Sequence, residues 1–483
     1  MTSRLLTLSI GVFVAAVVVL DHVPTPAVAA SPDVVTLSGV LTSADRDWGG
    51  ERTFIVPSGT SAIDIDLTCP DGEPESLLDF GVGGPSGLRG WSTARHDHVH
   101  LDALSASLGY LPGPIEAGQW RVLLGAPPRR DGSNTAYQIT VRLSNGPAPT
   151  WPVLRASPGW FAGDLHVHSG HSDGYRDDPR GRQRPVLVRD VIAAGSAAQL
   201  DFLAITDHNT ASHWVDIDRA QAASPTLLLL HGREITTARG HFNAIGERRF
   251  TDFRLGPRRP MSTLLEQVAR NGAFVSINHA WLSSSDWCNG CGWADRDAET
   301  MQRVAGIEVL NGSTPTRGIA GPGWAFWADR LEHGQHAVPV GGSDVHDPFE
   351  GRASLRSPAT VVWASALSEE AIVAGLKSGR VFVRASPGSK SVLDLTARSA
   401  QTTVGMGQTI GPGRVTLAAH VTGSARQQCY WIRRGHKSEP VDLLSDDDTT
   451  TLTVDAVSGD WFSVIVSRDG QPQLISNAVF VKN

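Results

Sequence analysis

The most informative stretch of this chain is GDLHVHSGHSDG, which runs from Gly163 to Gly174. An apolar strand is expected to lead into it. His166 and His168 alternate, so on a strand both imidazoles point to the same face. A Gly/Ser-rich turn then allows Asp173 to fold back toward them. Two neutral imidazoles and one carboxylate from a single short segment suit a divalent metal ion.

Short apolar runs alternate with helical stretches from Trp160 to about Val383, which predicts a parallel sheet or barrel buried on both faces. Side chains at the carboxyl ends of successive parallel strands gather around one mouth of a barrel. A single histidine there is as often a packing residue as a ligand, but the whole series predicts a metal centre. The candidate ligands are His166, His168, Asp173, His208, Glu234, His241, His279, Asp344 and His346.

Several cations held close together need bridging carboxylates, and Glu234 and Asp344 are suitable. We expect Glu234, Asp344 and His279 to be the catalytic residues. One zinc ion already lowers the pKa of bound water to about 7, so water between cations would give a hydroxide nucleophile near neutral pH. The metals would also stabilise charge in the transition state. Asp207 is expected either to orient the imidazole of His208 or to cap the following helix.

The motifs follow the order HxH, SDG, TDH, GxEIT, NH and GSDxH. This order resembles the PHP (polymerase and histidinol phosphatase) superfamily of metallohydrolases over roughly residues 158–390. RGWS at Arg89, GYLPGPI at Gly109 and CNGCGW at Cys288 resemble its secreted CehA/McbA branch. The resemblance implies a distorted (β/α)7 barrel with two or three divalent metal ions, often zinc, manganese or iron.

The resemblance also distributes the ligands among three metal ions. Many members with three metals have a histidine where this chain has Asp173, which leaves the filling of the third site open. The first ion would be held by His166, His168, Glu234 and Asp344, the second by the bridging Glu234 with His241 and His279, and the third by Asp173, His208 and His346.

The regions on either side of the expected barrel have β character. Residues 31–147 contain period-two alternation, as from Ala62 to Leu67, and Gly/Pro-rich turns, which predicts a β-sandwich or jelly roll. A Pro-rich linker leads to the barrel, which we place at residues 153–388. Residues 389–483 predict a small β-rich C-terminal domain. The expected fold class is therefore α/β, with β-domains flanking the barrel.

Residues 1–30 are interpreted as a signal peptide. Arg4 supplies the positive charge, Leu5–Leu20 the apolar core and Ala27–Ala29 an A-x-A cleavage site. A transmembrane anchor is the alternative, but the apolar run is short for a span. We therefore expect a protein that is secreted or held in the cell envelope and has no membrane span after cleavage.

The chain has 483 residues, a net charge of −7 and a pI of about 6.2. This charge argues against non-specific binding of nucleic acid or anionic membranes, which requires a basic face. The expected partner is a small-molecule or oligomeric ester, anionic because a cluster of cations suits an anion. The sequence leaves the oligomeric state open.

The four cysteines are Cys69, Cys288, Cys291 and Cys429. Cys288 and Cys291 form a CxxC with no second CxxC, which argues against a structural zinc knuckle. We predict a local disulfide in a Trp-rich loop, since export permits disulfides. Cys69 and Cys429 lie in different expected domains, and their redox state stays open.

These observations predict a secreted metallohydrolase that uses a metal-bound hydroxide to cleave phosphoesters, as a phosphodiesterase or phosphatase does. A carboxyl-ester, amide or carbamate hydrolase on the same centre is the alternative. A second alternative is a non-enzymatic, metal-loaded surface or adhesion protein. Loss of several ligands would favour that alternative, and none of the expected ligands is lost.

A further histidine cluster lies at Arg95–His100, inside the expected β-sandwich. Alternation places His96, His98 and His100 on one strand face, as in a metal site. We expect no partner near them and interpret them as part of a solvated face.

Overall fold

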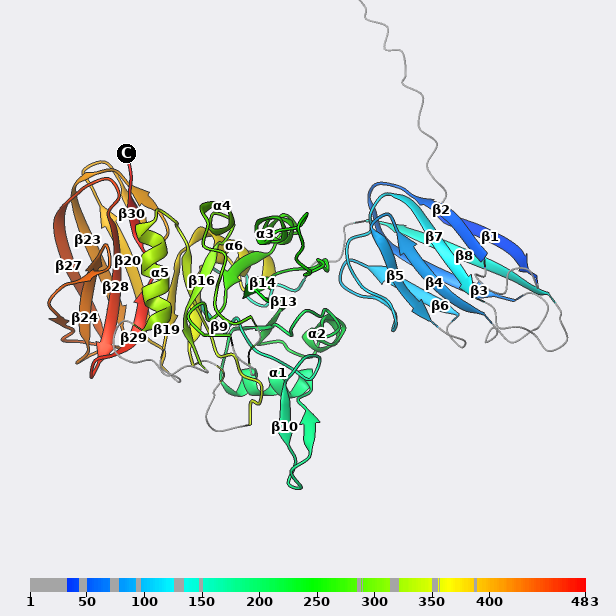
Figure 1. Ribbon diagram of the computed structural model, residues 1–483, viewed down its shortest axis with the longest axis horizontal. Helices are drawn as coiled ribbons and strands as arrows, with labels where there is room; N and C mark the ends of the chain where they lie inside the picture. Colours follow the sequence, from blue (N-terminus) through cyan, green and yellow to red (C-terminus); the bar gives the residue numbers. More distant parts are fainter. Residues whose placement is uncertain are drawn as a thin grey trace, which may run out of the picture.

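The structure is a computed structural model, and Figure 1 shows how its elements follow one another along the chain. It describes residues 33–42, 50–69, 78–92, 97–125, 134–146, 151–284, 288, 290–312, 321–349, 355, 357–385 and 389–483. The expected signal peptide lies outside these residues. Within them, no helix has both the length and the apolar character needed to cross a membrane.

The N-terminal strands form two four-stranded antiparallel sheets that share one apolar core. The first sheet has the order β1 (Val34–Leu41), β8 (Thr135–Asn145), β3 (Thr60–Thr68), β6 (His98–Asp102), and the second β2 (Gly50–Val56), β7 (Gly118–Gly125), β4 (Asp79–Gly84), β5 (Gly87–Ser92). Alternate side chains such as Ile63 and Ile65 of β3 and Val122 of β7 are fully buried. The period-two pattern therefore reflects one buried face on each sheet.

The central region combines buried strands with short helices. Its strands are β9 (Gly159–Asp164), β12 (Phe202–Ile205), β13 (Leu228–Thr237), β14 (Gly240–Ile245), β15 (Phe274–Ile277), β16 (Gly306–Asn311) and β17 (Val338–Gly342), with the small hairpin β10 (Tyr175–Asp177) and β11 (Gln183–Pro185). Its helices are α1 (Val188–Ala197), α2 (Trp214–Gln221), α3 (Met261–Arg270), α4 (Ala298–Met301), α5 (Pro322–Glu332) and α6 (Glu369–Ser378). β9 and β12 to β17 are neighbours in this order in one sheet, whereas β10 and β11 form a separate two-stranded sheet.

One strand departs from the expected parallel arrangement. β14 runs antiparallel to β13 and to β15, whereas β9, β12 and β13, and likewise β15, β16 and β17, pair in parallel. Only Ala238 and Arg239 separate β13 from β14, and two residues can form a hairpin but not a parallel crossover. The expectation of continuous parallel pairing is therefore wrong at this strand.

The first and last strands of this path meet just beyond their ends. Val167, after β9, forms a parallel bridge with Val345, after β17. The backbone N–H of Asp344 donates to the carbonyl of His166 at 2.8 Å, and that of His168 donates to Val345 at 2.9 Å. The central strands therefore curl until their two ends join, which brings the GDLHVHSGHSDG segment against the GSDVH segment.

The C-terminal strands extend the central sheet. β9 pairs with β18 (Ala359–Ala364), β18 with β19 (Val381–Arg384), and β19 with β29 (Gln471–Ser476). The other strands are β20 (Val392–Arg398), β21 (Thr403–Gly405), β22 (Thr409–Ile410), β23 (Gly413–Thr422), β24 (Gln428–Arg433), β25 (His436–Lys437), β26 (Val441–Asp442), β27 (Asp447–Ala456), β28 (Trp461–Arg468) and β30 (Val479–Val481). One apolar cluster includes both Phe382 and Phe462, so sheet and core run continuously past residue 388.

A glycine in β9 allows close packing of the central strands. Gly163 pairs with Phe202, whose ring is fully buried and lies where a Cβ on residue 163 would be. We expect Gly163→Ala to lower the free energy of unfolding by about 1–3 kcal/mol, because neither strand can move aside in a packed core. Denaturant unfolding measures the change.

Gly256→Ala is the matched control, since a Cβ there would meet no atom within 4 Å. Its free energy of unfolding should stay within about 0.5 kcal/mol of the unaltered chain. Equal stability of the two variants would contradict the packing described for β9 and β12.

Candidate metal centre

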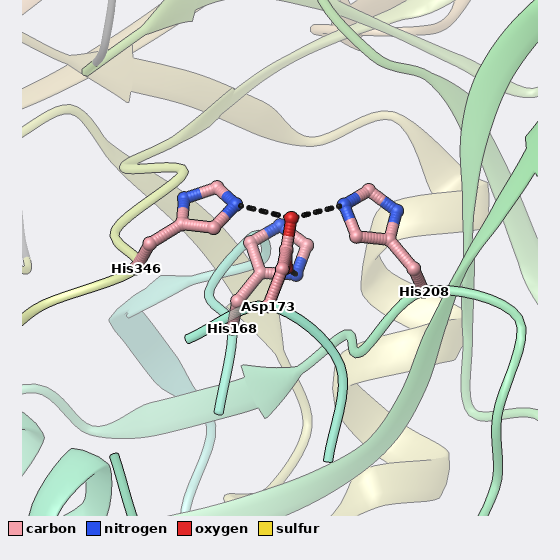
Figure 2. Close-up of side chains that lie close together, drawn as sticks. All are labelled: His168, Asp173, His208 and His346. Carbon is pink, nitrogen blue, oxygen red and sulfur yellow. Dashed lines mark ion pairs between the residues drawn. The ribbon is translucent and has the colours of Figure 1, made fainter. Parts of the chain in front are cut away.

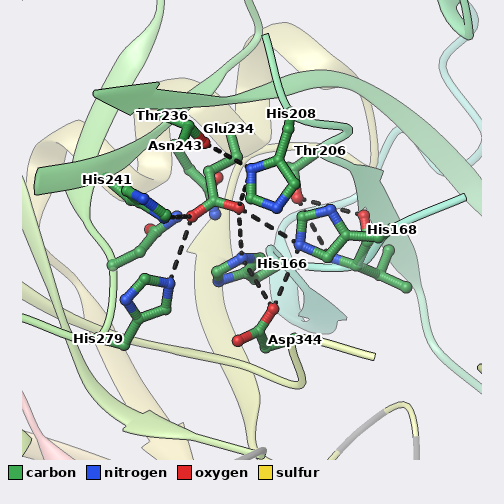
Figure 3. A network of polar contacts seen from close by, with 12 residues as sticks. His166, His168, Thr206, His208, Glu234, Thr236, His241, Asn243, His279 and Asp344 are labelled. Atoms are coloured by element: carbon green, nitrogen blue, oxygen red, sulfur yellow. Dashed lines mark hydrogen bonds and ion pairs between the residues drawn. The ribbon is translucent and has the colours of Figure 1, made fainter. Parts of the chain in front are cut away.

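Side chains from separate segments converge at one end of the central strands, as Figure 3 shows. His166 and His168 follow β9, His208 follows β12, Glu234 lies in β13, His241 in β14, His279 follows β15, and Asp344 and His346 follow β17. Asp173 returns to the same place from the turn after His168. The structure thus brings all the predicted ligands together, while their binding of metal remains a prediction.

Glu234 lies at the middle of this group and is fully buried. Its Oε2 lies 3.2 Å from Nε2 of His166, 3.4 Å from Nε2 of His168 and 3.1 Å from Nδ1 of His208. Burial raises the pKa of this carboxyl, but the charges of His208 and His166 outweigh that effect and hold the pKa well below its usual value. Glu234 is therefore ionised.

The other oxygen of Glu234 faces a second pair of imidazoles. Oε1 lies 3.1 Å from Nδ1 of His241 and 3.3 Å from Nε2 of His279, and it accepts a hydrogen bond of 2.9 Å from the side-chain amide of Asn278. Each carboxylate oxygen thus has its own set of nitrogen donors. A carboxylate whose two oxygens face different sets of imidazoles can bridge two cations.

Asp344 is the second carboxylate of the buried group. Its Oδ1 lies 3.3 Å from Nε2 of His166 and 3.2 Å from Nε2 of His168. Asp344 and His279 have positive φ angles of 53° and 26°, in the left-handed region that residues other than glycine rarely adopt. Such backbone strain is typical of functional sites, where it aims a side chain that a relaxed backbone would direct elsewhere.

His168 provides a test of whether a metal ion fits this group. It is fully buried, and neither ring nitrogen has a well-oriented hydrogen-bond partner among the described residues. Burial, together with the neighbouring His346 and His208, lowers the pKa of His168 to about 4. A neutral, buried imidazole without hydrogen bonds is costly unless another group uses its lone pair, and a metal ion would do so.

Other histidines of the group hold protons that a metal would have to displace. Burial lowers the pKa of His166, but Asp344, Glu234 and Glu308 together raise it well above its usual value. The pKa of His346 is raised to about 9, because its contacts with Asp173 and Asp344 outweigh burial. Metal binding at this centre must therefore release protons.

A more exposed group lies beside the buried one (Figure 2). Asp173 Oδ2 lies 3.5 Å from Nε2 of His208 and 3.3 Å from Nε2 of His346, and Oδ1 lies 3.8 Å from Nδ1 of His168. The Asp173 side chain is 55% exposed and that of His346 38%. With four ligand atoms within 4.8 Å of one another, the group could hold an ion on the solvent side of the centre.

Sequence reasoning missed Glu308, which positions two of the histidines. Glu308 is buried in β16, with Oε1 3.1 Å from Nδ1 of His166 and Oε2 2.7 Å from the backbone N–H of His279. Nε2 of His166 is left facing Glu234 and Asp344. A charged residue inside the apolar run GIEVL was the available signal, since carboxylates are rarely buried without a partner.

Asp207 neither caps α2 nor orients the imidazole of His208, which were its two expected roles. The N-cap of α2 is His213, and no hydrogen bond is seen from Asp207 to the His208 ring among the described residues. Its carboxylate accepts hydrogen bonds from the backbone N–H and hydroxyl of Ser169, at 2.7 and 2.6 Å, and from Ser172. Asp207 therefore holds the turn that carries Asp173.

The histidines of the β-sandwich do have partners, so the expectation of isolated side chains was wrong. Nδ1 of His98 lies 2.8 Å from Asp66, and Nδ1 of His100 lies 2.8 Å from Asp64, both across the β3–β6 ladder. Sequence alternation alone could not show which residues of another strand lie opposite. Neither His98 nor His100 belongs to a set of close metal-ligating atoms among the described residues, and His96 lies outside those residues.

The predicted disulfide between Cys288 and Cys291 is confirmed. The bridge lies next to the candidate metal centre, because Sγ of Cys291 is 3.7 Å from Nδ1 of His279.

No protein-family model matches this chain, and no curated protein matches it significantly. Among solved structures, it is similar to a two-domain protein containing a predicted PHP-like metal-dependent phosphoesterase from Bacteroides vulgatus ATCC 8482. That match has a TM-score of 0.37 and 20% identity, and it covers 69% of this chain and 100% of that one. PliG of Aeromonas hydrophila, a periplasmic inhibitor of g-type lysozyme, matches with a TM-score of 0.15 and 13% identity over 23% of this chain and 86% of its own.

Glu308 should affect metal binding although it is not among the expected ligands. In Glu308→Gln, one of the two accepting oxygens becomes an NH2 group that faces either His166 or the N–H of His279. We expect metal affinity to fall by about 10- to 100-fold, as for other partners of ligand histidines. Competition against a metal-binding dye measures the affinity.

Glu299→Gln on α4 is the matched control, because that side chain is 71% exposed. It should leave metal affinity unchanged. Equal affinities of the two variants would show that Glu308 does not position the ligands.

Proposed function

We propose that this chain is a metal-dependent hydrolase that cleaves phosphoesters at the centre around Glu234. The observation that carries the proposal is one buried carboxylate approached by imidazole nitrogens from five histidines, which are His166, His168, His208, His241 and His279. Burying so many polar groups is costly unless they bind a charge. Mixed nitrogen and oxygen donors suit zinc, manganese or iron.

Each side chain of such a centre would have a separate role. Bound divalent cations would supply water of lowered pKa and polarisation of a substrate oxygen. Glu234 presents one oxygen to each set of histidines, so its charge would offset the repulsion between two cations. Asp344 adds negative charge beside His166 and His168. Glu308 fixes the His166 ring in the orientation that presents Nε2 to this space.

An anionic substrate suits the charge and the exposure of the site. The candidate carboxylate ligands are Asp173, Glu234 and Asp344. Their total negative charge is smaller than the positive charge of two or three divalent cations. The ligand shell would therefore stay positive and attract a phosphoester. Asp173 and His346 are the exposed members, which supports approach of substrate from their side.

We also propose that the chain is a PHP-superfamily protein of the CehA/McbA branch, with a distorted (β/α)7 barrel. The order of the ligand motifs supports this assignment. The joining of the ends of β9 and β17 and the gathering of ligands at the strand ends agree with a barrel. The hairpin that reverses β14 would be one source of its distortion.

We expect purified protein to carry at least two divalent metals per chain and to lose hydrolysis when a chelator removes them. Glu234→Gln should lower kcat/KM for a chromogenic phosphoester by roughly 100-fold or more, because a neutral amide cannot offset the repulsion of two cations. Elemental analysis of Glu234→Gln should show the loss of about one metal ion.

His98→Ala is the control, since His98 pairs with Asp66 outside the centre. It should keep full activity and metal content. Phosphomonoesters, phosphodiesters, carboxyl esters and carbamates tested side by side identify the bond cleaved. Activity that survives chelation would contradict the metal-dependent reaction, and turnover restricted to carboxyl esters or carbamates would contradict the phosphoester.

Asp173→Ala tests the exposed group separately. Removing this carboxylate leaves His208 and His346 without their shared partner, so an ion held there should be lost. We expect metal content to fall by about one ion while part of the activity survives, because the ligands around Glu234 are intact. Unchanged metal content would show that the exposed group holds no ion.

A further inference from the structure

The loop after β15 places two sulfur atoms behind the metal centre. Cys291 is buried, and its Sγ lies 3.7 Å from Nδ1 of His279, while Nε2 of that ring faces Glu234. The sulfur atoms of Cys288 and Cys291 and one ring nitrogen of His241 all lie within 4.8 Å of one another. Two potential thiolates and an imidazole therefore share one small space.

Residues 290, 293 and 294 of this loop pack against the β13–β14 hairpin. Gly290 packs on the backbone of Thr237, and Gly240 packs on the ring of Trp293, so closely that neither glycine could carry a Cβ. The N–H of Ala294 donates to the carbonyl of Arg239 at 2.9 Å. Cys291, which lies between these contacts, is thus kept beside His241 by packing and not by the disulfide alone.

We propose that Cys288, Cys291 and His241 form a second metal site, which binds a thiophilic ion such as Zn²⁺, Cd²⁺ or Cu⁺ when the two cysteines are reduced. Thiolates and imidazole are the ligands that such ions prefer. In the disulfide form the sulfurs no longer act as anionic ligands, and His241 keeps its contact with Glu234. The redox state of the pair therefore decides whether His241 is shared between two metal sites.

The chemistry needs only a two-electron reductant. A phosphine donates two electrons to the S–S bond and takes an oxygen atom from water, which leaves a phosphine oxide and two thiols. The thiols lose their protons when the metal ion binds. A disulfide reagent reverses the change by accepting two electrons from the dithiol.

The test uses the purified full chain and Cd²⁺, whose thiolate complexes absorb in the near ultraviolet. A water-soluble phosphine is the reductant, because dithiols would themselves bind cadmium. We expect the reduced chain to take up about one more Cd²⁺ than the oxidised chain and to show the thiolate-to-cadmium absorption band. Equal uptake by both forms, or uptake without the band, would overturn the proposal.

Variants assign the ligands. Cys291→Ser should abolish the band, and His241→Ala should weaken Cd²⁺ binding by roughly tenfold or more. Cys69→Ser is the matched control, because it removes a cysteine of the N-terminal sandwich, and it should keep the band. A band that persists in Cys291→Ser, or an unchanged affinity in His241→Ala, would refute the site. If Cys291→Ser does not fold, alkylation of the reduced unaltered chain replaces it and should abolish the band.

This inference and the proposed hydrolase can fail independently. Chelator-sensitive hydrolysis is measured on the oxidised chain, in which the thiolate site does not exist. Hydrolysis without the cadmium band would overturn only the second metal site. The band without hydrolysis would overturn only the hydrolase.

Discussion

The structure of this protein depends on how the buried negative charge of Glu234 is compensated. Glu234 has no contact with solvent, and an isolated carboxylate in such a place would be driven to take up a proton. Histidine nitrogens on both of its oxygens keep it ionised. Because these histidines come from segments far apart in sequence, the central strands must curl and join before the charge is compensated. Fold and site are thus coupled through a single side chain.

The surroundings of the site show how its geometry is maintained. Glu308 fixes the ring of His166 and the backbone of His279, and Asp207 fixes the turn before Asp173. Gly342 lets β17 pass so close that a Cβ would overlap the side chain of His166. Each of these residues acts on a ligand or on the backbone next to one. The candidate ligands are therefore held before any ion arrives, which lowers the cost of ordering them on binding.

The sequence predicted those parts that follow from local patterns. Alternation in β3 gave the sandwich, and polar residues after apolar runs gave the nine candidate ligands, from His166 to His346, that the structure brings together. It did not predict contacts between segments. Glu308 lies 142 positions from His166, and the carboxylates beside His98 and His100 lie on another strand, so only the folded chain shows their roles. The reversal of β14 could have been predicted from its two-residue connection, but the alternation of apolar runs with helical stretches across the whole region was interpreted as a parallel sheet or barrel.

The continuous pairing from β18 through β19 to β29 concerns more than the arrangement of the C-terminal strands. A chain cut near residue 388 would keep β19 and its pairing with β18 but would lose β29 on the other side. This loss would leave a row of unsatisfied N–H and C=O groups beside an uncovered apolar surface around Phe382. Exposed edges of this kind recruit strands from other molecules. The C-terminal strands thus protect this edge of the central sheet, so the central region and the C-terminal strands are expected to be inherited, expressed and lost as one unit.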